Sequence, residues 1–256
     1  MNIKPKYKVF LLWLVMVSSA LPLQAKESPQ DIRVAVASNF ATTMNLLAQA
    51  FSKKTGHTVH VARASTGKHY AQILQGAPFD IFFSADAERV EKLVESGDRT
   101  KNASFVYAIG RLVLWSRYSE LIRGNPPSLS ALNFRYLAIA DPELAPYGTA
   151  ARDVLVNMGL WDQLDSSIVR GENIGQAFQF VYTGNAELGF VAASQLNQIA
   201  ISGSGWDVPQ YLHKPIVQKG LVLSDSNIAH EFVEFVTSSE GRAMIAADGY
   251  LLPDEQ

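Results

Sequence analysis

The sequence predicts a two-lobed α/β fold in which each lobe is a mixed sheet flanked by helices. Short apolar strands alternate with amphipathic helices from residue 31 onward, and a second series of this kind begins at Tyr136. Such alternation is typical of a mostly parallel sheet covered by helices on both faces. A third observation is the late apolar segment KPIVQKGLVL, which follows the second series. We expect it to return to the first lobe, so that two crossing strands join the lobes as a hinge.

The first 25 residues are interpreted as a secretory signal peptide. Basic residues precede the apolar run VFLLWLVMVSSALPL, and Gln24-Ala25 provides a small-residue cleavage site. A membrane anchor is disfavoured, because the apolar run is shorter than the roughly 20 residues that a spanning helix needs. We therefore expect an exported chain cleaved after Ala25.

Composition limits the possible partners and the source of stability. Removing Lys4, Lys6 and Lys8 leaves 19 basic against 24 acidic residues, a formal charge near −5. This disfavours a nucleic-acid partner, which needs a basic patch. The chain has no cysteine, so a hydrophobic core rather than disulfides must stabilise it. About 230 residues are enough for one large domain or two lobes.

The first lobe is predicted to begin with three strand–helix pairs. The strand IRVAVA leads into a helix over 41–55, TVHVARA leads into a helix over about 68–75, and FDIFFSA leads into a helix over 87–96. SFVYAIG and RLVLWS then form a long apolar run broken by Gly110, which we interpret as the first crossing strand.

The second lobe is predicted to start with the strand YLAIAD and the loop PELAPYG. A helix over 149–158, the segment IVRG, a helix over 174–182 and the strand ELGFVAA follow, and helices over 228–237 and 240–248 end the chain. The expected division is a signal peptide at 1–25, a discontinuous lobe 1 at 26–108 plus 221–256, and lobe 2 at 109–220.

Four polar corners stand where a strand or loop enters a helix. The first N–H groups of a helix lack intrahelical partners and carry the positive end of its dipole, so they accept anions. In open α/β sheets the ligand crevice lies at the carboxyl ends of the strands, where all four corners fall. A single corner is more typical of an ordinary N-cap, but two in each lobe indicate an anion site. The corners are Ser38-Asn39, Ser65-Thr66-Gly67, Pro146-Tyr147-Gly148-Thr149 and Glu172-Asn173-Ile174-Gly175.

Other chemistry is less favoured. Gly67-Lys68 fails as a nucleotide phosphate loop, because Ala62 and His69 occupy positions that need Gly and Ser or Thr, so Lys68 is interpreted as a solvated lysine. The five histidines lack metal-ligand spacing, and no G-x-S-x-G motif is present. Asp80 and Asp86 are interpreted as capping or loop-fixing residues. We expect no catalytic residue, no cofactor and no metal cation site.

The sequence resembles a known family at several segments. AVASNF, ASTGKHYAQI, GAPFDIFFSAD, ADPELAPYG and ELGFVAAS are similar, in order and spacing, to segments of the periplasmic molybdate-binding proteins of ABC importers. GAPFDIFFSAD and DPELAPYG are the specific segments, and the similarity covers nearly the whole mature chain.

The resemblance implies a class II periplasmic-binding-protein fold that holds a molybdate dianion, and also tungstate, through neutral hydrogen bonds. One branch of the family has a small residue at the position of Tyr147 and binds the ligand with a tyrosine at the position of Ala192. In this sequence the tyrosine stands at 147, so Tyr147 is expected to bind the ligand. Molybdenum would be held only as the oxyanion. The implied ligand-binding residues are Ser38, Asn39, Ser65, Thr66, Tyr147 and the backbone N–H of Ile174.

The resemblance also implies a periplasmic, monomeric, non-enzymatic protein whose partner is an ABC importer permease in the inner membrane. Three alternatives stay open. The first is a binding protein for another oxyanion such as sulfate, phosphate or an organic phosphonate. The second is a secreted α/β hydrolase, which would need a base close to Ser38 or Ser65. The third is a sensor or adaptor that keeps the fold.

Overall fold

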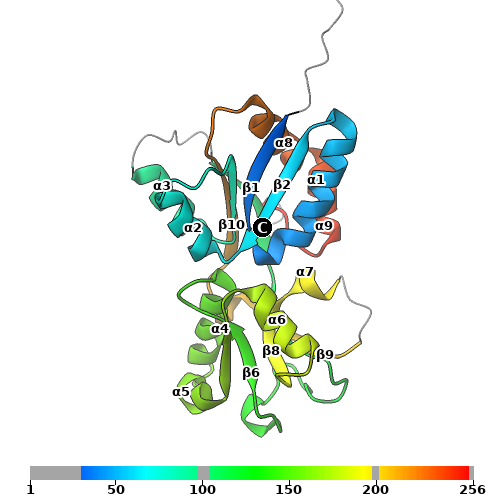
Figure 1. Ribbon diagram of the computed structural model, residues 1–256. Coiled ribbons are helices and arrows are strands. Elements are labelled where there is room, and N and C mark those ends of the chain that lie inside the picture. Colours follow the sequence, from blue (N-terminus) through cyan, green and yellow to red (C-terminus); the bar gives the residue numbers. More distant parts are fainter. Residues whose placement is uncertain (1–29, 97–103, 198–201, 254–256) are drawn as a thin grey trace, which may run out of the picture.

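The computed structural model describes residues 30–96, 104–197 and 202–253, so the expected signal peptide lies outside the described residues. The chain forms two lobes, one above the other in Figure 1, and each lobe is built on a five-stranded mixed sheet flanked by helices. The fold class expected from the sequence is therefore confirmed. Among the described residues, no helix is both long and apolar enough to cross a membrane.

The first sheet has the strand order β2-β1-β3-β10-β4. β1 pairs in parallel with β2 and β3, whereas β10 pairs antiparallel with β3 and β4. The late segment of the sequence thus lies inside the first sheet. The strands are β1 (Asp31–Ala37), β2 (Thr58–Ala64), β3 (Ile81–Ser84), β4 (Ser104–Gly110) and β10 (Ile216–Val222).

Helices cover both faces of this sheet. On one face, Met44 and Phe51 of α1 pack with Phe232 of α8. On the other face, Ile73 of α2 and Val90 of α3 pack against the sheet. The helical elements of this lobe are a 3₁₀ turn (Ser38–Phe40), α1 (Ala41–Thr55), α2 (Thr66–Leu74), α3 (Glu88–Glu95), α8 (Asn227–Thr237) and α9 (Ser239–Ala247).

The second sheet has the order β7-β6-β8-β5-β9, with β6 parallel to β7 and β8 and with β5 antiparallel to β8 and β9. Strand β9 was not expected, because the short polar segment SGWD carries little strand signal. Trp206 of β9 is nevertheless buried in the core. The strands are β5 (Leu112–Ser116), β6 (Leu137–Ala140), β7 (Ile168–Gly171), β8 (Leu188–Ala192) and β9 (Ser204–Asp207).

The helices of the second lobe pack on opposite faces of its sheet. Val154 of α4 lies in one core cluster and Phe178 of α6 lies in another. Helix α4 begins at Pro146, three residues before the expected start. The helical elements are α4 (Pro146–Asn157), α5 (Trp161–Leu164), α6 (Ile174–Tyr182), α7 (Ala193–Leu196) and 3₁₀ turns at Leu129–Ala131, Asp165–Ser167 and Gln210–Leu212.

Two segments connect the lobes. β4 ends at Gly110 in the first sheet, and β5 begins at Leu112 in the second. The return runs from the end of β9 at Asp207 to the start of β10 at Ile216. Because the connections are short, the carboxyl ends of β1, β2 and β3 are held facing the start of α4 and α6.

Candidate functional site

A small cavity lies where the two lobes meet. The volume open to the centre of a water-sized molecule is about 10 Å³. All six ligand-binding residues expected from the sequence line it, so the structure brings them to one place. Of the described residues around it, none is Asp, Glu, His, Lys or Arg. The lining residues are Ala37, Ser38, Asn39, Ser65, Thr66, Ala85, Ala145, Pro146, Tyr147 and Ile174.

Two hydroxyl groups at the cavity are already used as acceptors by backbone N–H groups. Ser38 Oγ accepts a hydrogen bond of 3.2 Å from Gly175 N–H, which belongs to the other lobe. Thr66 Oγ1 accepts one of 3.1 Å from Ala85 N–H. Since each oxygen faces a donor, its own proton is free to be donated to an anion in the cavity.

Three helices begin at the cavity: α2 at Thr66, α4 at Pro146 and α6 at Ile174. Their first-turn N–H groups have no intrahelical acceptor and carry positive partial charge. The hydrogen bonds found among the described residues do not use the N–H of Thr66, Tyr147 or Ile174. Ser65 Oγ and Asn173 Oδ1 cap α2 and α6 by accepting from the third helical residue. The geometry therefore aims N–H groups from both lobes at one point.

Asn39 turns its side chain away from this set of donors. Its Nδ2 donates to Gln218 Oε1 at 2.7 Å and to Tyr250 Oη at 3.2 Å. Its backbone oxygen accepts from the Tyr250 hydroxyl at 2.8 Å. Since both side-chain and carbonyl groups are engaged beside the hinge, the backbone N–H is the group that Asn39 can offer to the cavity.

The side chain of Tyr147 is 1% exposed, and its hydroxyl lies over Gly110. A Cβ atom at Gly110 would come within 2.2 Å of that hydroxyl, so only glycine fits there. Within the described part of the chain, neither Tyr147 Oη nor the neighbouring Gln218 Nε2 has a hydrogen-bond partner of good geometry. Burial raises the pKa of Tyr147 well above its usual value of 10.0, so the phenol stays protonated and remains a donor.

The interpretation of Lys68 as a solvated lysine is incomplete. Its Nζ pairs with Glu172 Oε1 of the other lobe at 2.7 Å, and both side chains are about half exposed, 50% and 48%. The sequence contains no local signal for this pair, because the two residues are 104 positions apart. Lys68 does not line the cavity.

The two aspartates behave as capping and loop-fixing residues. Asp86 accepts from Arg89 N–H at 3.0 Å near the start of α3. Asp80 accepts from Arg33 N–H at 2.7 Å and from the Ser224 hydroxyl at 2.7 Å, which fixes two loops. Sequence reasoning missed Gly110 and Gln218, since neither has a local pattern that reveals its place beside the cavity.

Comparisons with known proteins show the family to which the chain belongs. The family model described as bacterial extracellular solute-binding protein matches residues 32–251. The molybdate-binding protein ModA of Azotobacter vinelandii is 40% identical over 242 residues, covering 93% of this chain and 96% of the relative. ModA of Rhodobacter capsulatus is 40% identical over 240 residues, covering 93% of each chain.

A solved structure of a molybdate-binding protein has the same fold. The periplasmic molybdate-binding protein of Azotobacter vinelandii superposes with a TM-score of 0.82 at 40% identity, over 87% of this chain and 99% of that one. The resemblance found in the sequence is thereby confirmed. The chain belongs to the family of bacterial extracellular solute-binding proteins, in which these molybdate-binding proteins are its relatives.

Proposed function

We propose that this protein captures molybdate in the cavity between its lobes and delivers it to an ABC importer. The observation that carries the proposal is the set of neutral donors, drawn from both lobes, around a cavity whose described lining residues carry no charged side chain. Similarity to two molybdate-binding proteins at 40% identity supports the same ligand. The proposed ligand-binding residues are Ser38, Asn39, Ser65, Thr66, Tyr147 and Ile174.

Neutral donors suit a fully deprotonated tetrahedral dianion. Each molybdate oxygen only accepts hydrogen bonds, and fixed N–H and O–H donors can stabilise the charge without a counter-ion. Phosphate keeps a proton near neutral pH and would need an acceptor, but no carboxylate lines the described cavity. Tungstate offers the same acceptors as molybdate, and we include it in the proposal.

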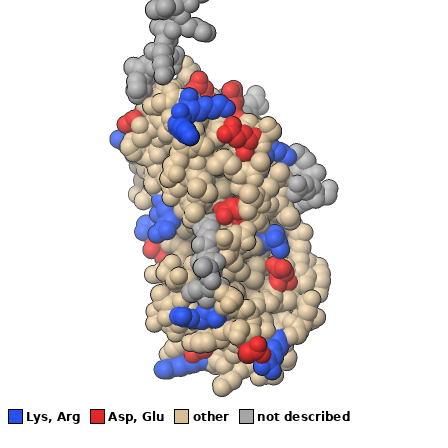
Figure 2. Space-filling view, turned by 90° about the vertical axis from the view of Figure 1, so that its right-hand side faces the viewer, with Lys and Arg blue, Asp and Glu red and all other residues tan. Residues whose placement is uncertain are grey.

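The cellular context follows from the same proposal. We place the mature protein in the periplasm as a monomer, with a permease in the inner membrane as its partner. We propose the lobe division expected from the sequence with its boundaries moved to Gly110 and Ile216, because β4 and β10 belong to the first sheet. On the face shown in Figure 2, basic and acidic side chains are interspersed.

Binding rather than hydrolysis is supported by the residues around the hydroxyl groups. A nucleophilic serine needs an adjacent base. His69 lies on α2 near Ser65 in sequence, but its Nδ1 pairs with Gln72 Oε1 at 3.1 Å and the residue does not line the cavity. The hydroxyl groups of Ser38, Ser65 and Thr66 instead accept hydrogen bonds from backbone N–H groups.

Thermal unfolding of the mature protein with different anions tests the proposal. A ligand that binds only the folded state stabilises it by RT ln(1 + [L]/Kd), about 4 kcal/mol at a thousandfold excess over Kd. We expect molybdate and tungstate to raise Tm, and sulfate and phosphate at equal concentration and ionic strength to leave it unchanged. Equal shifts with sulfate or phosphate would favour a general oxyanion-binding protein, and no shift with molybdate would refute the proposal.

A further inference from the structure

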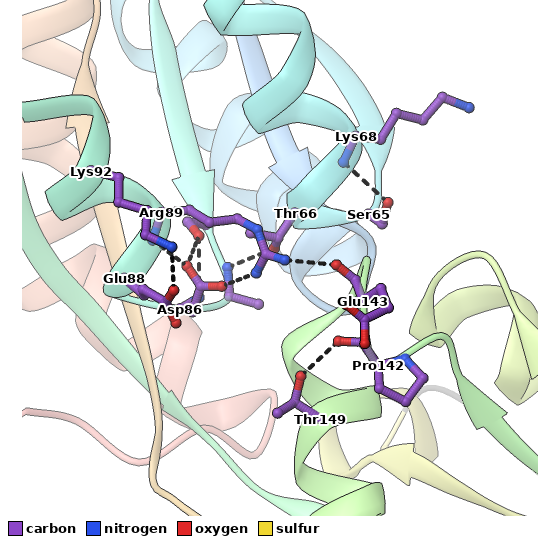
Figure 3. A network of polar contacts seen from close by, with 12 residues as sticks. Ser65, Thr66, Lys68, Asp86, Glu88, Arg89, Lys92, Pro142, Glu143 and Thr149 are labelled. Atoms are coloured by element: carbon purple, nitrogen blue, oxygen red, sulfur yellow. Dashed lines mark hydrogen bonds and ion pairs between the residues drawn. The ribbon is translucent and has the colours of Figure 1, made fainter. Parts of the chain in front are cut away.

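The loop of residues 141–145, here termed the docking loop, leads directly into α4 and its cavity-lining N-terminus. Three successive carbonyl groups of this loop each accept one hydrogen bond. Pro142 O accepts from the Thr149 hydroxyl at 2.9 Å, within the same lobe. The next two acceptors, Glu143 O and Leu144 O, take their bonds from the other lobe. Figure 3 shows the bond to Glu143 O.

Arg89 of α3 supplies one of these bonds. Its Nη2 donates to Glu143 O at 2.9 Å, while its Nη1 pairs with Asp86 Oδ2. Asp86 also accepts from Arg89 N–H and from the Ser84 hydroxyl, each at 3.0 Å. The Arg89 and Asp86 side chains are only 21% and 18% exposed. One edge of the guanidinium group is therefore fixed within the first lobe before the other edge meets the docking loop, which limits the entropy lost on docking.

Gly67 supplies the other bond, from its N–H to Leu144 O at 2.9 Å. Gly67 follows the cavity-lining Thr66 in α2. A Cβ at Gly67 would lie 3.0 Å from Leu144 O and 3.5 Å from Arg89 Nη2. The donors from α2 and α3 thus lie side by side, and each bonds one of two successive carbonyl groups.

We propose that Arg89 is a positioning residue for anion capture. It holds the docking loop, and through it the first N–H groups of α4, against the first lobe without lining the cavity itself. This inference rests on the proposed function. It adds that Arg89 sets how long the bound anion stays in the protein. A contact that forms only when the lobes meet stabilises the closed state, so it slows ligand release and leaves the encounter with the open protein unchanged.

The Lys68–Glu172 pair also joins the lobes, but it is a single contact between half-exposed side chains. Exposed ion pairs of this kind contribute about 0–1 kcal/mol. Arg89 is less exposed, is fixed by Asp86 and acts together with Gly67. We therefore assign the larger effect on release to Arg89.

The test measures molybdate association and dissociation rates by stopped-flow tryptophan fluorescence for the wild type, Arg89→Gln, Arg89→Lys and Lys92→Gln. Lys92 is the matched control, because it lies on the same helix and pairs with Glu88 of that helix rather than with the second lobe. Both glutamine variants remove one positive charge. We expect Arg89→Gln to raise the dissociation rate about tenfold, the loss of one charge-assisted hydrogen bond, with an association rate within about twofold of wild type.

Lys92→Gln should match the wild type in both rates. Arg89→Lys should release molybdate faster than the wild type. An ammonium group keeps the charge, but it lacks the planar guanidinium whose two nitrogens bond Asp86 and Glu143 at the same time. Gly67→Ala is a second variant that keeps Arg89. Its methyl group meets Leu144 O only when the lobes are closed, so it should also speed dissociation while the Tm of the ligand-free protein does not fall.

The outcomes separate the two proposals. If the wild type shows no molybdate binding, the proposed function fails and this inference fails with it. If the wild type binds while Arg89→Gln dissociates at the wild-type rate, or Lys92→Gln dissociates as fast as Arg89→Gln, only the positioning role is refuted. If Arg89→Gln does not fold, Gly67→Ala decides the test. A molybdate dissociation rate in Gly67→Ala equal to that of the wild type would refute the role of the docking loop in closure.

Discussion

The hydroxyl groups of Ser38 and Thr66 are oriented so that each can donate its proton to an anion. Each hydroxyl oxygen accepts from a backbone N–H, at 3.2 Å and 3.1 Å. The proton is thereby oriented away from that donor and toward the cavity. Replacing either hydroxyl removes a charge-assisted bond to an anion and also leaves a backbone N–H without its acceptor.

We predict that Ser38→Ala and Thr66→Val each weaken molybdate binding by about 10- to 100-fold, or about 1.5–3 kcal/mol. Thr66→Ser keeps the hydroxyl and should stay close to wild type. Lys68→Ala should change Kd little, because its charge is outside the cavity and is screened over a Debye length of about 8 Å at physiological salt. Calorimetric titration at low and high salt measures all four. A large, salt-sensitive loss in Lys68→Ala beside normal binding by the hydroxyl variants would show a site held by a counter-charge.

A substitution at Tyr147 can show whether its buried hydroxyl contributes to ligand binding or to the stability of the fold. Its hydroxyl is buried and lacks a partner of good geometry within the described residues, which costs free energy in the ligand-free state. We predict that Tyr147→Phe does not lower the Tm of the ligand-free protein but weakens molybdate binding by about tenfold. Unchanged affinity with unchanged Tm would leave only the backbone N–H of Tyr147 as a donor.

Among the elements, the starts of the helices matter most to the site. Helix α4 was predicted to begin at Thr149 but begins at Pro146, after the extended Ala145. Proline is favoured at the first helical position because its fixed φ suits the helix and its missing N–H would have no partner there. The earlier start places the N–H of Tyr147 in the first turn, beside the cavity. Local propensity thus accounts for a detail on which the anion site depends.

Helix α2 also carries a buried histidine whose titration should be visible in stability. His69 is 2% exposed, and burial lowers its pKa below the usual 6.5, although the bond to Gln72 and the nearby backbone of Val36 and Ala62 oppose the shift. The folded state therefore keeps His69 neutral in a range where the unfolded chain takes up a proton. Stability from this group is present above pH 6.5 and is lost as pH falls below it, by at most about 1.4 kcal/mol per pH unit.

We predict that Tm falls more steeply between pH 7 and pH 5 in the wild type than in His69→Gln, which cannot be protonated. Calorimetric scans across that range measure the difference in slope. His230→Gln is the matched control, since it removes another histidine outside the buried set. Parallel slopes for the wild type and His69→Gln would contradict the assignment.

At the scale of the whole molecule, the site exists only where the lobes meet. Hydrogen bonds cross the cleft from Gly175 N–H to Ser38 Oγ, from Gly67 N–H to Leu144 O and from Arg89 Nη2 to Glu143 O. Two short connections, at Arg111 and between Asp207 and Ile216, join the lobes and can act as the hinge. A ligand that contacts both lobes must favour the arrangement in which these bonds form.

We predict that saturating molybdate decreases the radius of gyration of the mature protein in small-angle X-ray scattering. Without ligand, the lobes should separate about the two connections. Arg89→Gln should still become compact at saturation, because the ligand bonds remain, whereas Ser38→Ala should need more molybdate to reach the same state. An identical radius with and without molybdate, in a protein that calorimetry shows to bind it, would exclude hinge closure.

The fold class could be predicted because alternating strand and helix patterns are local and repeat along the chain. The segment KPIVQKGLVL could be placed in the first lobe because the terminal strand and helices are too small to fold alone, and β10 lies between β3 and β4. Strand β9 could not be predicted, since SGWD is polar and short and becomes a strand only by pairing with β5. The bridging role of Arg89 could not be predicted either, because Glu143 is 54 residues away.

The sequence by itself determined the two α/β lobes and the residue types at each polar corner, because hydrophobic periodicity and helix capping act over a few residues. Only the tertiary structure decided that these corners share one cavity, that Lys68 pairs across the cleft, and that Arg89 and Gly67 hold the docking loop. These contacts join residues far apart in the chain. They depend on how the two connections orient one lobe against the other, which no local pattern specifies.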